Sequence, residues 1–234
     1  MTKYNHRLNI QTAPILREVV FGVEDGMVST LGAITGIAIG SQDYYMILLS
    51  GAVIIAVESI SMGIGSYLAN QSEQEANSRK LVEEKIELSE YPEEEKTELF
   101  RMFLRDGWSK NLSRQMIDEA SRNKELMFKE MVYRELEIST GELTSPLKKG
   151  LYMFFSYILG GLVPLFAYIV VLPVALAMKV SMAVTLAGLF GLGAATTRYT
   201  KGSWWRTGLR LLVLGGVALF VGFWIGKTAI LISK

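Results

Sequence analysis

The sequence predicts an all-α membrane protein with five transmembrane helices and a soluble helical insert. Half of the 234 residues are hydrophobic and the mean hydropathy is +0.28, which is typical of a chain that crosses a bilayer. The charged residues are crowded into residues 70–149 instead of being spread along the chain. We therefore divide the chain into transmembrane helices 1 and 2 (1–69), a helical insert (70–149) and transmembrane helices 3 to 5 (150–234).

The first apolar run, Arg17 to Gly40, follows a polar lead without the features of a signal peptide. It is long enough to span, since a span needs about 20 residues, and it contains Glu24 and Asp25. A carboxylate in the bilayer costs on the order of 3 kcal/mol, so a retained one is a candidate functional residue. Alternatively, Asp25 lies at the headgroup boundary, because it follows Arg17 by only eight residues.

The second apolar run covers residues 44–69 and follows a very short turn. It contains one charge that we expect to be buried, Glu58, and Met62 lies four residues later on the same helix face. Small residues are frequent in this run, which lets another helix approach closely. They are Gly51, Ser59, Ser61, Gly63, Gly65 and Ser66.

The insert contains 18 Asp and Glu against 14 Lys and Arg, a local charge of −4. Its pattern predicts a helix over 72–88 and a second helix over 92–105, with Pro92 in the first turn. Asp106-Gly107 is expected to end that helix and Ser109 to cap the next one. Helical periodicity continues to about residue 136, and residues 142–149 are expected to form the linker back to the membrane.

Three further apolar runs cover 151–172, 174–197 and about 208–232. Pro173 leaves almost no loop between the first two, so they are predicted to form an antiparallel hairpin. The stretch 198–206 is basic and aromatic, as cytoplasmic interface segments are. Because Lys and Arg gather in the N-terminal tail, in the insert and in 198–206, the positive-inside rule places all three in the cytoplasm. The C-terminal lysines fall on the opposite side, which is a weak contradiction.

Six residues of the insert are candidate metal ligands. Four glutamates form two i, i+3 pairs, Glu84 with Glu87 and Glu95 with Glu98, which are eleven residues apart. A helix break at Pro92 would let the two pairs converge. Met131 and Glu135 have i, i+4 spacing. Carboxylates alone suit Mg²⁺ or Ca²⁺, whereas a nearby thioether favours Fe²⁺ or another first-row divalent ion. Alternatively, the glutamates form a solvated face and Met131 belongs to the core. The candidates are Glu84, Glu87, Glu95, Glu98, Met131 and Glu135.

Several classes of site are excluded by composition. Cysteine is absent and His6 is the single histidine, so thiolate sites, disulfides and sites that need two histidines cannot form. No basic stripe with interleaved aromatic residues indicates nucleic-acid binding. An enzyme with a di-metal centre among the glutamates is disfavoured because the insert contains no histidine.

Three stretches, REVVFGVEDGMVST, SISMGIGSYLANQSEQEA and SWWRTGLRLLVLGG, resemble the vacuolar iron transporter family in the family's order along essentially the whole chain. The resemblance implies no enzyme and no prosthetic group, but a homodimeric antiporter with five spans. Such proteins export Fe²⁺, often also Mn²⁺ and other divalent ions, from the cytosol in exchange for protons. The implied location is the plasma membrane in a prokaryote and the vacuolar membrane in a eukaryote, with the insert as a cytoplasmic metal-binding domain.

The resemblance also implies roles for individual residues. Asp25 and Met62 match positions that line the family's transport path, and the six candidate ligands match its metal-binding domain. Val132 departs from the best-known plant form, which has a second Met there, and Glu58 is carried as a secondary candidate for the path. The alternative function is a membrane-anchored metal sensor or scaffold that does not transport, although an anchor gives no reason to keep Asp25 in a span.

Overall fold

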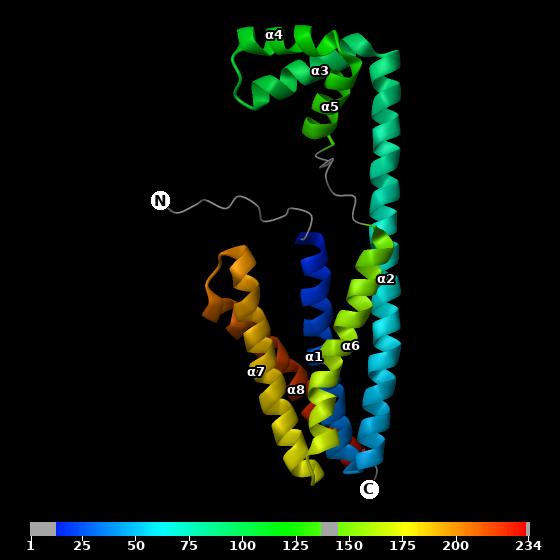
Figure 1. The fold of residues 1–234 in the computed structure, drawn as a ribbon, viewed down its shortest axis with the longest axis vertical. Coiled ribbons are helices and arrows are strands. Elements are labelled where there is room, and N and C mark those ends of the chain that lie inside the picture. Colours follow the sequence, from blue (N-terminus) through cyan, green and yellow to red (C-terminus); the bar gives the residue numbers. More distant parts are fainter. Residues whose placement is uncertain (1–12, 137–144, 233–234) are drawn as a thin grey trace. The chain divides into compact units, whose positions relative to one another are not determined.

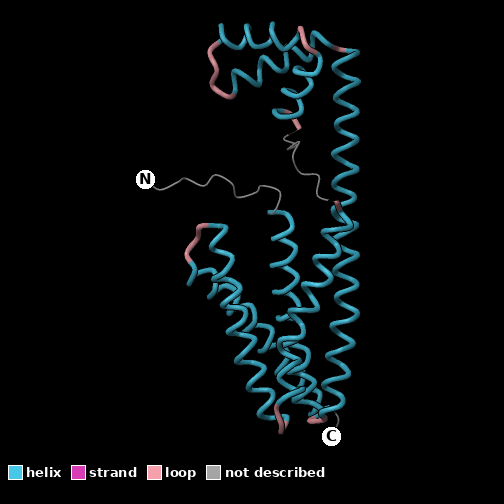
Figure 2. Tube along the Cα trace, viewed as in Figure 1, coloured by secondary structure: helices cyan, strands magenta, loops and turns pink. Residues whose placement is uncertain are grey.

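The computed structural model describes residues 13–136 and 145–232, and this part of the chain contains eight helices and no strand (Figure 1, Figure 2). The all-helical class predicted from the sequence is therefore confirmed. The helices are α1 (Ala13–Ser41), α2 (Tyr44–Glu90), α3 (Pro92–Arg105), α4 (Lys110–Ser121), α5 (Lys124–Arg134), α6 (Pro146–Val170), α7 (Val174–Thr200) and α8 (Trp204–Ile232).

The chain forms two compact units. We call Met1–Leu68 with Thr144–Lys234 the membrane unit, and Ala69–Leu143 the insert unit. Helix α2 contributes its first part to the membrane unit and its last part to the insert unit. The insert unit begins one residue before the predicted start of the insert and ends six residues before its predicted end.

Four helices in the described ranges, α2, α6, α7 and α8, are long and apolar enough to cross a membrane. Helix α1 has 29 residues, so it is also long enough, but its four charged residues lower its hydropathy. All four lie in the predicted first span, and two of them, Glu24 and Asp25, lie well inside it. A fifth span at α1 therefore stays a prediction, and it depends on how these acids are accommodated.

Helix α1 packs against both α6 and α8, and glycines bring its backbone into contact with each of them. A Cβ atom added at Gly22 would lie 2.9 Å from the carbonyl oxygen of Met153 in α6. One added at Gly36 would lie 2.8 Å from the carbonyl oxygen of Gly222 in α8. Such contacts between small residues are the usual way in which helices pack in membranes.

We expect Gly222→Ala to lower the melting temperature of the detergent-solubilised protein. A Cβ atom at Gly222 would collide with the carbonyl oxygen of Gly32, which is backbone and cannot rotate away. Overpacking of this kind costs about 1–3 kcal/mol. Gly216→Ala is the matched control on the same helix, since a Cβ atom there meets nothing within 4 Å. Equal melting temperatures for the two variants would contradict the α1–α8 contact.

The insert unit has its own hydrophobic core, built from α3, α4 and α5. The core residues are Leu99, Met102, Phe103, Ile117, Ala120, Met127 and Met131. The predicted cap is confirmed: Ser109 precedes α4 and its hydroxyl accepts a hydrogen bond from the Leu112 amide at 3.4 Å. Asn123 caps α5 in the same way. The helix is therefore interrupted between α4 and α5, where the sequence pattern predicted continuous helical periodicity.

The structure corrects three predicted boundaries. The predicted helix over 72–88 is not separate from the second apolar run, because α2 continues without a break from Tyr44 to Glu90. Of the predicted linker 142–149, residues 142–144 lie outside the described part, whereas Pro146 begins α6 and Lys148 and Lys149 lie in its first turns. The stretch 198–206 is mostly helical as well, since α7 ends at Thr200 and α8 begins at Trp204.

Candidate metal centre

Three of the six candidate ligands converge in the insert unit. Glu84, Glu95 and Glu135 each offer a carboxylate oxygen, and these oxygens lie within 4.8 Å of one another. The side chains come from α2, from α3 and from the residue that follows α5. Three carboxylates at this separation form a group that can hold a divalent cation.

The helix break before Pro92 brings the first two glutamates together. Helix α2 ends at Glu90 and Pro92 occupies the start of α3, where its missing N–H costs nothing. Glu84 therefore precedes the turn and Glu95 follows it, as the sequence predicted. Glu95 also lies in the first turn of α3, where the helix dipole favours negative charge.

Arg134 fixes the end of α5, from which Glu135 projects. Its guanidinium pairs with Asp106 in the α3–α4 turn and with Glu130, 3.1 Å away. It also lies over the ring of Phe103, with 4.4 Å between its central carbon and the ring centroid. A guanidinium can bond to two carboxylates and stack on a ring at the same time, so Arg134 acts as a positioning residue for Glu135.

Two of the carboxylates are buried although they are mutually repulsive. Glu84 is 1% exposed and Glu95 is 6% exposed. Oε1 of Glu84 and Oε2 of Glu95 have no hydrogen-bond partner among the described residues. A buried carboxylate oxygen without a partner is costly, and a bound cation would satisfy both oxygens.

Burial and like charge raise the pKa values of all three groups. Burial and the charges of Glu135 and Glu95 raise the pKa of Glu84 to about 8, and protonated Glu84 donates a hydrogen bond to Glu135. Burial and the charge of Glu98 raise the pKa of Glu95 to about 6, and the same two causes raise the pKa of Glu135. At neutral pH the metal-free cluster thus retains a proton, which a cation must displace.

The other three candidates occupy different surroundings. Glu87 and Glu98 are exposed, yet both act electrostatically on the buried carboxylates, so they lie at the rim of the cluster. Met131 is fully buried in the insert core, one turn before Glu135. Val132 is 2% exposed. A ligand role for Met131 stays a prediction, since the core position by itself accounts for its burial.

We expect the metal-free protein to unfold at a lower temperature at pH 8.5 than at pH 6. A carboxyl group with a raised pKa in the folded state contributes stability below its unfolded pKa, near 4.5, and that stability is lost as the pH rises through about 8 for Glu84. The shift should be roughly 5 °C or more, measured by circular dichroism with a chelator present.

Two Glu→Gln variants in α2, one a test and one a matched control, show whether the cluster causes this pH dependence. Glu84→Gln should flatten the dependence, since it removes the titrating group. Glu90→Gln changes the same charge at an exposed position and should leave the dependence unchanged. An unaltered dependence in Glu84→Gln would show that the cluster does not control it.

The candidate path residues lie on α1 and α2 of the membrane unit. Asp25 and Met62 are half-buried and Glu58 is exposed, so the expectation that Glu58 is buried is wrong for the single chain. Asp25 and Glu58 nevertheless lie near enough for their charges to repel each other. The two acids thus belong to one electrostatic neighbourhood.

A hydrogen-bonded pair lies beside Asp25. The hydroxyl of Ser29 donates to the backbone carbonyl of Asp25 at 2.7 Å and lies 2.6 Å from the hydroxyl of Tyr157 in α6. Tyr157 is fully buried and lies near enough to Asp25 and Glu58 for the charges of both acids to act on it. Sequence reasoning did not find Tyr157, because nothing local marks one tyrosine of α6 as the partner of α1.

Glu18 is a second membrane-unit carboxylate that sequence reasoning missed. It is 4% exposed, pairs with Arg17 at 3.2 Å and accepts a hydrogen bond from Ser66 of α2 at 2.8 Å. Its spacing of seven residues from Asp25 puts both acids on one face of α1. The seven-residue spacing is the sequence signal that could have identified Glu18 as a candidate.

Comparisons with known proteins show which family the chain resembles over most of its length. A model of the VIT family matches residues 16–227. The chain is 27% identical to vacuolar iron transporter 1 of Oryza sativa subsp. japonica over 213 residues, which cover 91% of this chain and 84% of the relative. It is also 27% identical to the vacuolar iron transporter of Toxoplasma gondii over 221 residues, covering 91% and 73% of the two chains.

Proposed function

Since the chain belongs to the VIT family, we propose that it is an antiporter that exports Fe²⁺ from the cytosol in exchange for protons, with Mn²⁺ and other divalent ions as further substrates. The observation that carries this proposal is the cluster of buried Glu84 and Glu95 with exposed Glu135 in a chain with span-length apolar helices. The cluster supplies a cation site in the insert, and the apolar helices supply the barrier that a transported ion must cross.

The proposed route has two stages. The cluster in the insert unit binds the ion from the cytosol, with Glu87, Glu98 and Met131 as further ligands. Asp25 then accepts it in the membrane unit, where Met62 offers a soft, neutral contact that holds Fe²⁺ without adding charge. Metal and proton occupancy at Asp25 exclude each other, which is the minimum requirement for exchange.

Transport into proteoliposomes tests the proposal. Vesicles that contain the protein should take up Fe²⁺ when the lumen is more acidic than the outside, and uptake should raise the luminal pH in proportion, because protons leave as the metal enters. Collapse of the gradient by a protonophore should slow uptake. If the protein binds metal but shows no uptake in any gradient, it is not a transporter. That result would favour the alternative, a membrane-anchored sensor or scaffold, which would use the same acidic cluster to bind metal.

We further propose that α1 is the fifth span, that the insert is cytoplasmic and that the protein is a two-fold dimer. Asp25 and Glu58 must face an aqueous or protein interior and not lipid. Glu58 is exposed in the single chain, and a copy of α1 and α2 across a two-fold axis would cover it. This places the transport path between the two protomers.

Disulfide crosslinking should detect this dimer, since the native chain has no cysteine. Val57 is 60% exposed next to Glu58, so we expect Val57→Cys to give a crosslinked dimer on mild oxidation. Ser29 and Ser59 are poorer positions, because Ser29 is bonded to Tyr157 and Ser59 is 1% exposed. Phe166→Cys, at an equally exposed site of α6, is the control. Crosslinking through Phe166→Cys alone would contradict the arrangement.

A further inference from the structure

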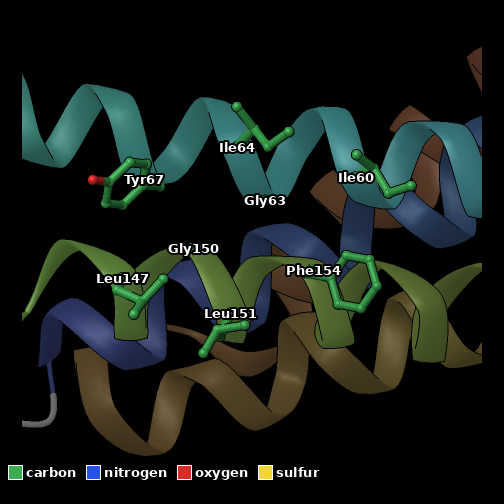
Figure 3. Close-up of a pocket in the computed structure, with 8 residues that line it drawn as sticks. All are labelled: Ile60, Gly63, Ile64, Tyr67, Leu147, Gly150, Leu151 and Phe154. Carbon is green, nitrogen blue, oxygen red and sulfur yellow. The ribbon is translucent and has the colours of Figure 1, made fainter.

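The insert unit contains a pocket of about 640 Å³ between the last turns of α2 and the first turns of α3 and α5, which we call the insert pocket. Its volume lies within the range of small-molecule sites. It differs from the crevice of about 310 Å³ between α2 and α6 in the membrane unit, whose lining residues are uncharged (Figure 3). Four lysines line the insert pocket: Lys85 from α2, Lys96 from α3, and Lys124 and Lys129 from α5.

The insert pocket is positively charged although the insert as a whole is acidic. Its lining has four lysines against one acid, Glu125, whereas residues 70–149 carry a net charge of −4. The lysines belong to three helices, so they are not the polar face of a single helix. A cleft lined by charges of one sign focuses the electric field and attracts ions of the opposite sign. The lining therefore favours an anion with several charges.

The four lysines are available to such an anion. In the part of the chain that the structure describes, no carboxylate pairs with Lys85 or Lys124. The other two lysines pair with acids of their own helices, Glu93 and Glu125, each at 2.7 Å. Both of these acids are exposed, and exposed ion pairs contribute about 1 kcal/mol at most. A ligand with several negative charges can therefore displace them.

The rest of the lining includes an aromatic ring and further apolar side chains. Leu88, Pro92, Met127 and Phe128 contribute to it. The ammonium of Lys85 lies over the Phe128 ring, 5.1 Å from the ring centroid, so a positive charge and a flat apolar surface lie next to each other. Inorganic phosphate would use the lysines alone, whereas a nucleotide also offers a base that stacks on aromatic side chains.

We propose that the insert pocket binds a nucleoside triphosphate, with its phosphates held by Lys85 and Lys124 and its base against Phe128. The lysines select the phosphates, because an ammonium binds phosphate as a point charge, and the aromatic ring selects the base. The site shares α2 with the metal cluster, since Lys85 directly follows Glu84. The proposal concerns the insert alone and does not depend on whether the chain transports metal.

Calorimetry of the full chain in detergent, with divalent ions removed beforehand on a chelating resin, tests the proposal with ATP, tripolyphosphate and adenosine. The wild type should bind one ATP per chain, more tightly than tripolyphosphate and much more tightly than adenosine. Lys85→Gln with Lys124→Gln should weaken the binding of ATP and of tripolyphosphate by about tenfold. Phe128→Leu should weaken ATP binding by about fivefold or more and leave tripolyphosphate binding unchanged.

Two control variants make the result decisive. Lys80→Gln with Lys110→Gln removes two exposed lysines, one from α2 and one from the first position of α4, that do not line the pocket, and it should bind ATP as the wild type does. Tyr133→Leu removes an exposed ring of α5 outside the pocket and should also have no effect.

Three results would overturn the proposal. If the wild type does not bind ATP, the insert pocket is not a nucleotide site. Equal weakening in the two lysine double variants would show a general attraction of anions to the insert and no defined site. If tripolyphosphate binds as tightly as ATP, or if Phe128→Leu binds ATP as the wild type does, the base is not recognised and the pocket binds phosphate groups alone.

Discussion

Metal uptake into proteoliposomes should fall to the background level when Asp25 is replaced by Asn, and metal-driven proton movement should disappear with it. Asparagine preserves the shape of the side chain but can neither release a proton nor neutralise a cation. If Asp25 alternates between proton and metal, both fluxes depend on the same group and are lost together. The variant should remain folded, because Ser29 contacts the backbone carbonyl at position 25 and not the carboxylate.

Glu24→Gln is the matched control for this experiment, since it removes an acid from the neighbouring position of α1. It should keep most of the flux and the proton coupling. Met62→Ala should reduce flux and alter the preference among ions while leaving the coupling intact, because a thioether selects ions without carrying a proton. Metal flux with an intact proton countercurrent in Asp25→Asn would make Asp25 a boundary residue, and Glu58 would become the first residue to test.

Metal affinity of the full chain should fall by about two orders of magnitude or more when Glu84 and Glu95 are both replaced by Gln. These two carboxylates are the buried members of the cluster, and each has an oxygen without a hydrogen-bond partner in the described ranges. Calorimetry in detergent with Mn²⁺ as an air-stable substitute for Fe²⁺ measures the effect. Wild-type affinity should rise with pH as Glu84 and Glu95 lose their protons.

Two further variants separate the cluster from the general acidity of the insert. Glu83→Gln with Glu94→Gln removes two exposed charges next to the same positions, and it should leave affinity within a few-fold of the wild type. Met131→Leu nearly preserves volume in the insert core and should weaken Fe²⁺ binding more than Mn²⁺ binding if the thioether is a ligand. Equal affinity in the two double variants would place the site elsewhere.

The sequence predicted those parts of the insert whose signals are local. Helix α3 has the predicted bounds, because Pro92 and Asp106-Gly107 act on the backbone at their own positions. The continuity of α2 was not predicted, because the change from apolar to charged residues near residue 70 marks a change of surroundings and not of backbone conformation. Neither glycine nor proline interrupts the chain between Gly65 and Pro92, so the helix continues across the change.

The candidate site was predictable only where spacing determines it. The convergence of Glu84 and Glu95 follows from the helix break between them, whereas the position of Glu135 depends on contacts between α5 and α3, including Arg134 with Phe103. The burial of Glu18 depends on Ser66, which is 48 residues away along the chain. Contacts over such separations leave no local pattern that a sequence can show.

The close glycine contacts of α1 with α6 and with α8 constrain how the membrane unit can move. Gly26 is packed against the backbone of Tyr157 in α6, and Gly36 against the backbone of Gly222 in α8. A helix whose backbone touches both neighbours cannot rotate or slide alone without separating one pair of them. Asp25 should therefore move together with α1, α6 and α8 as one rigid block. In the proposed dimer, access to Asp25 would change from one side of the membrane to the other when this block moves against the same block of the second copy.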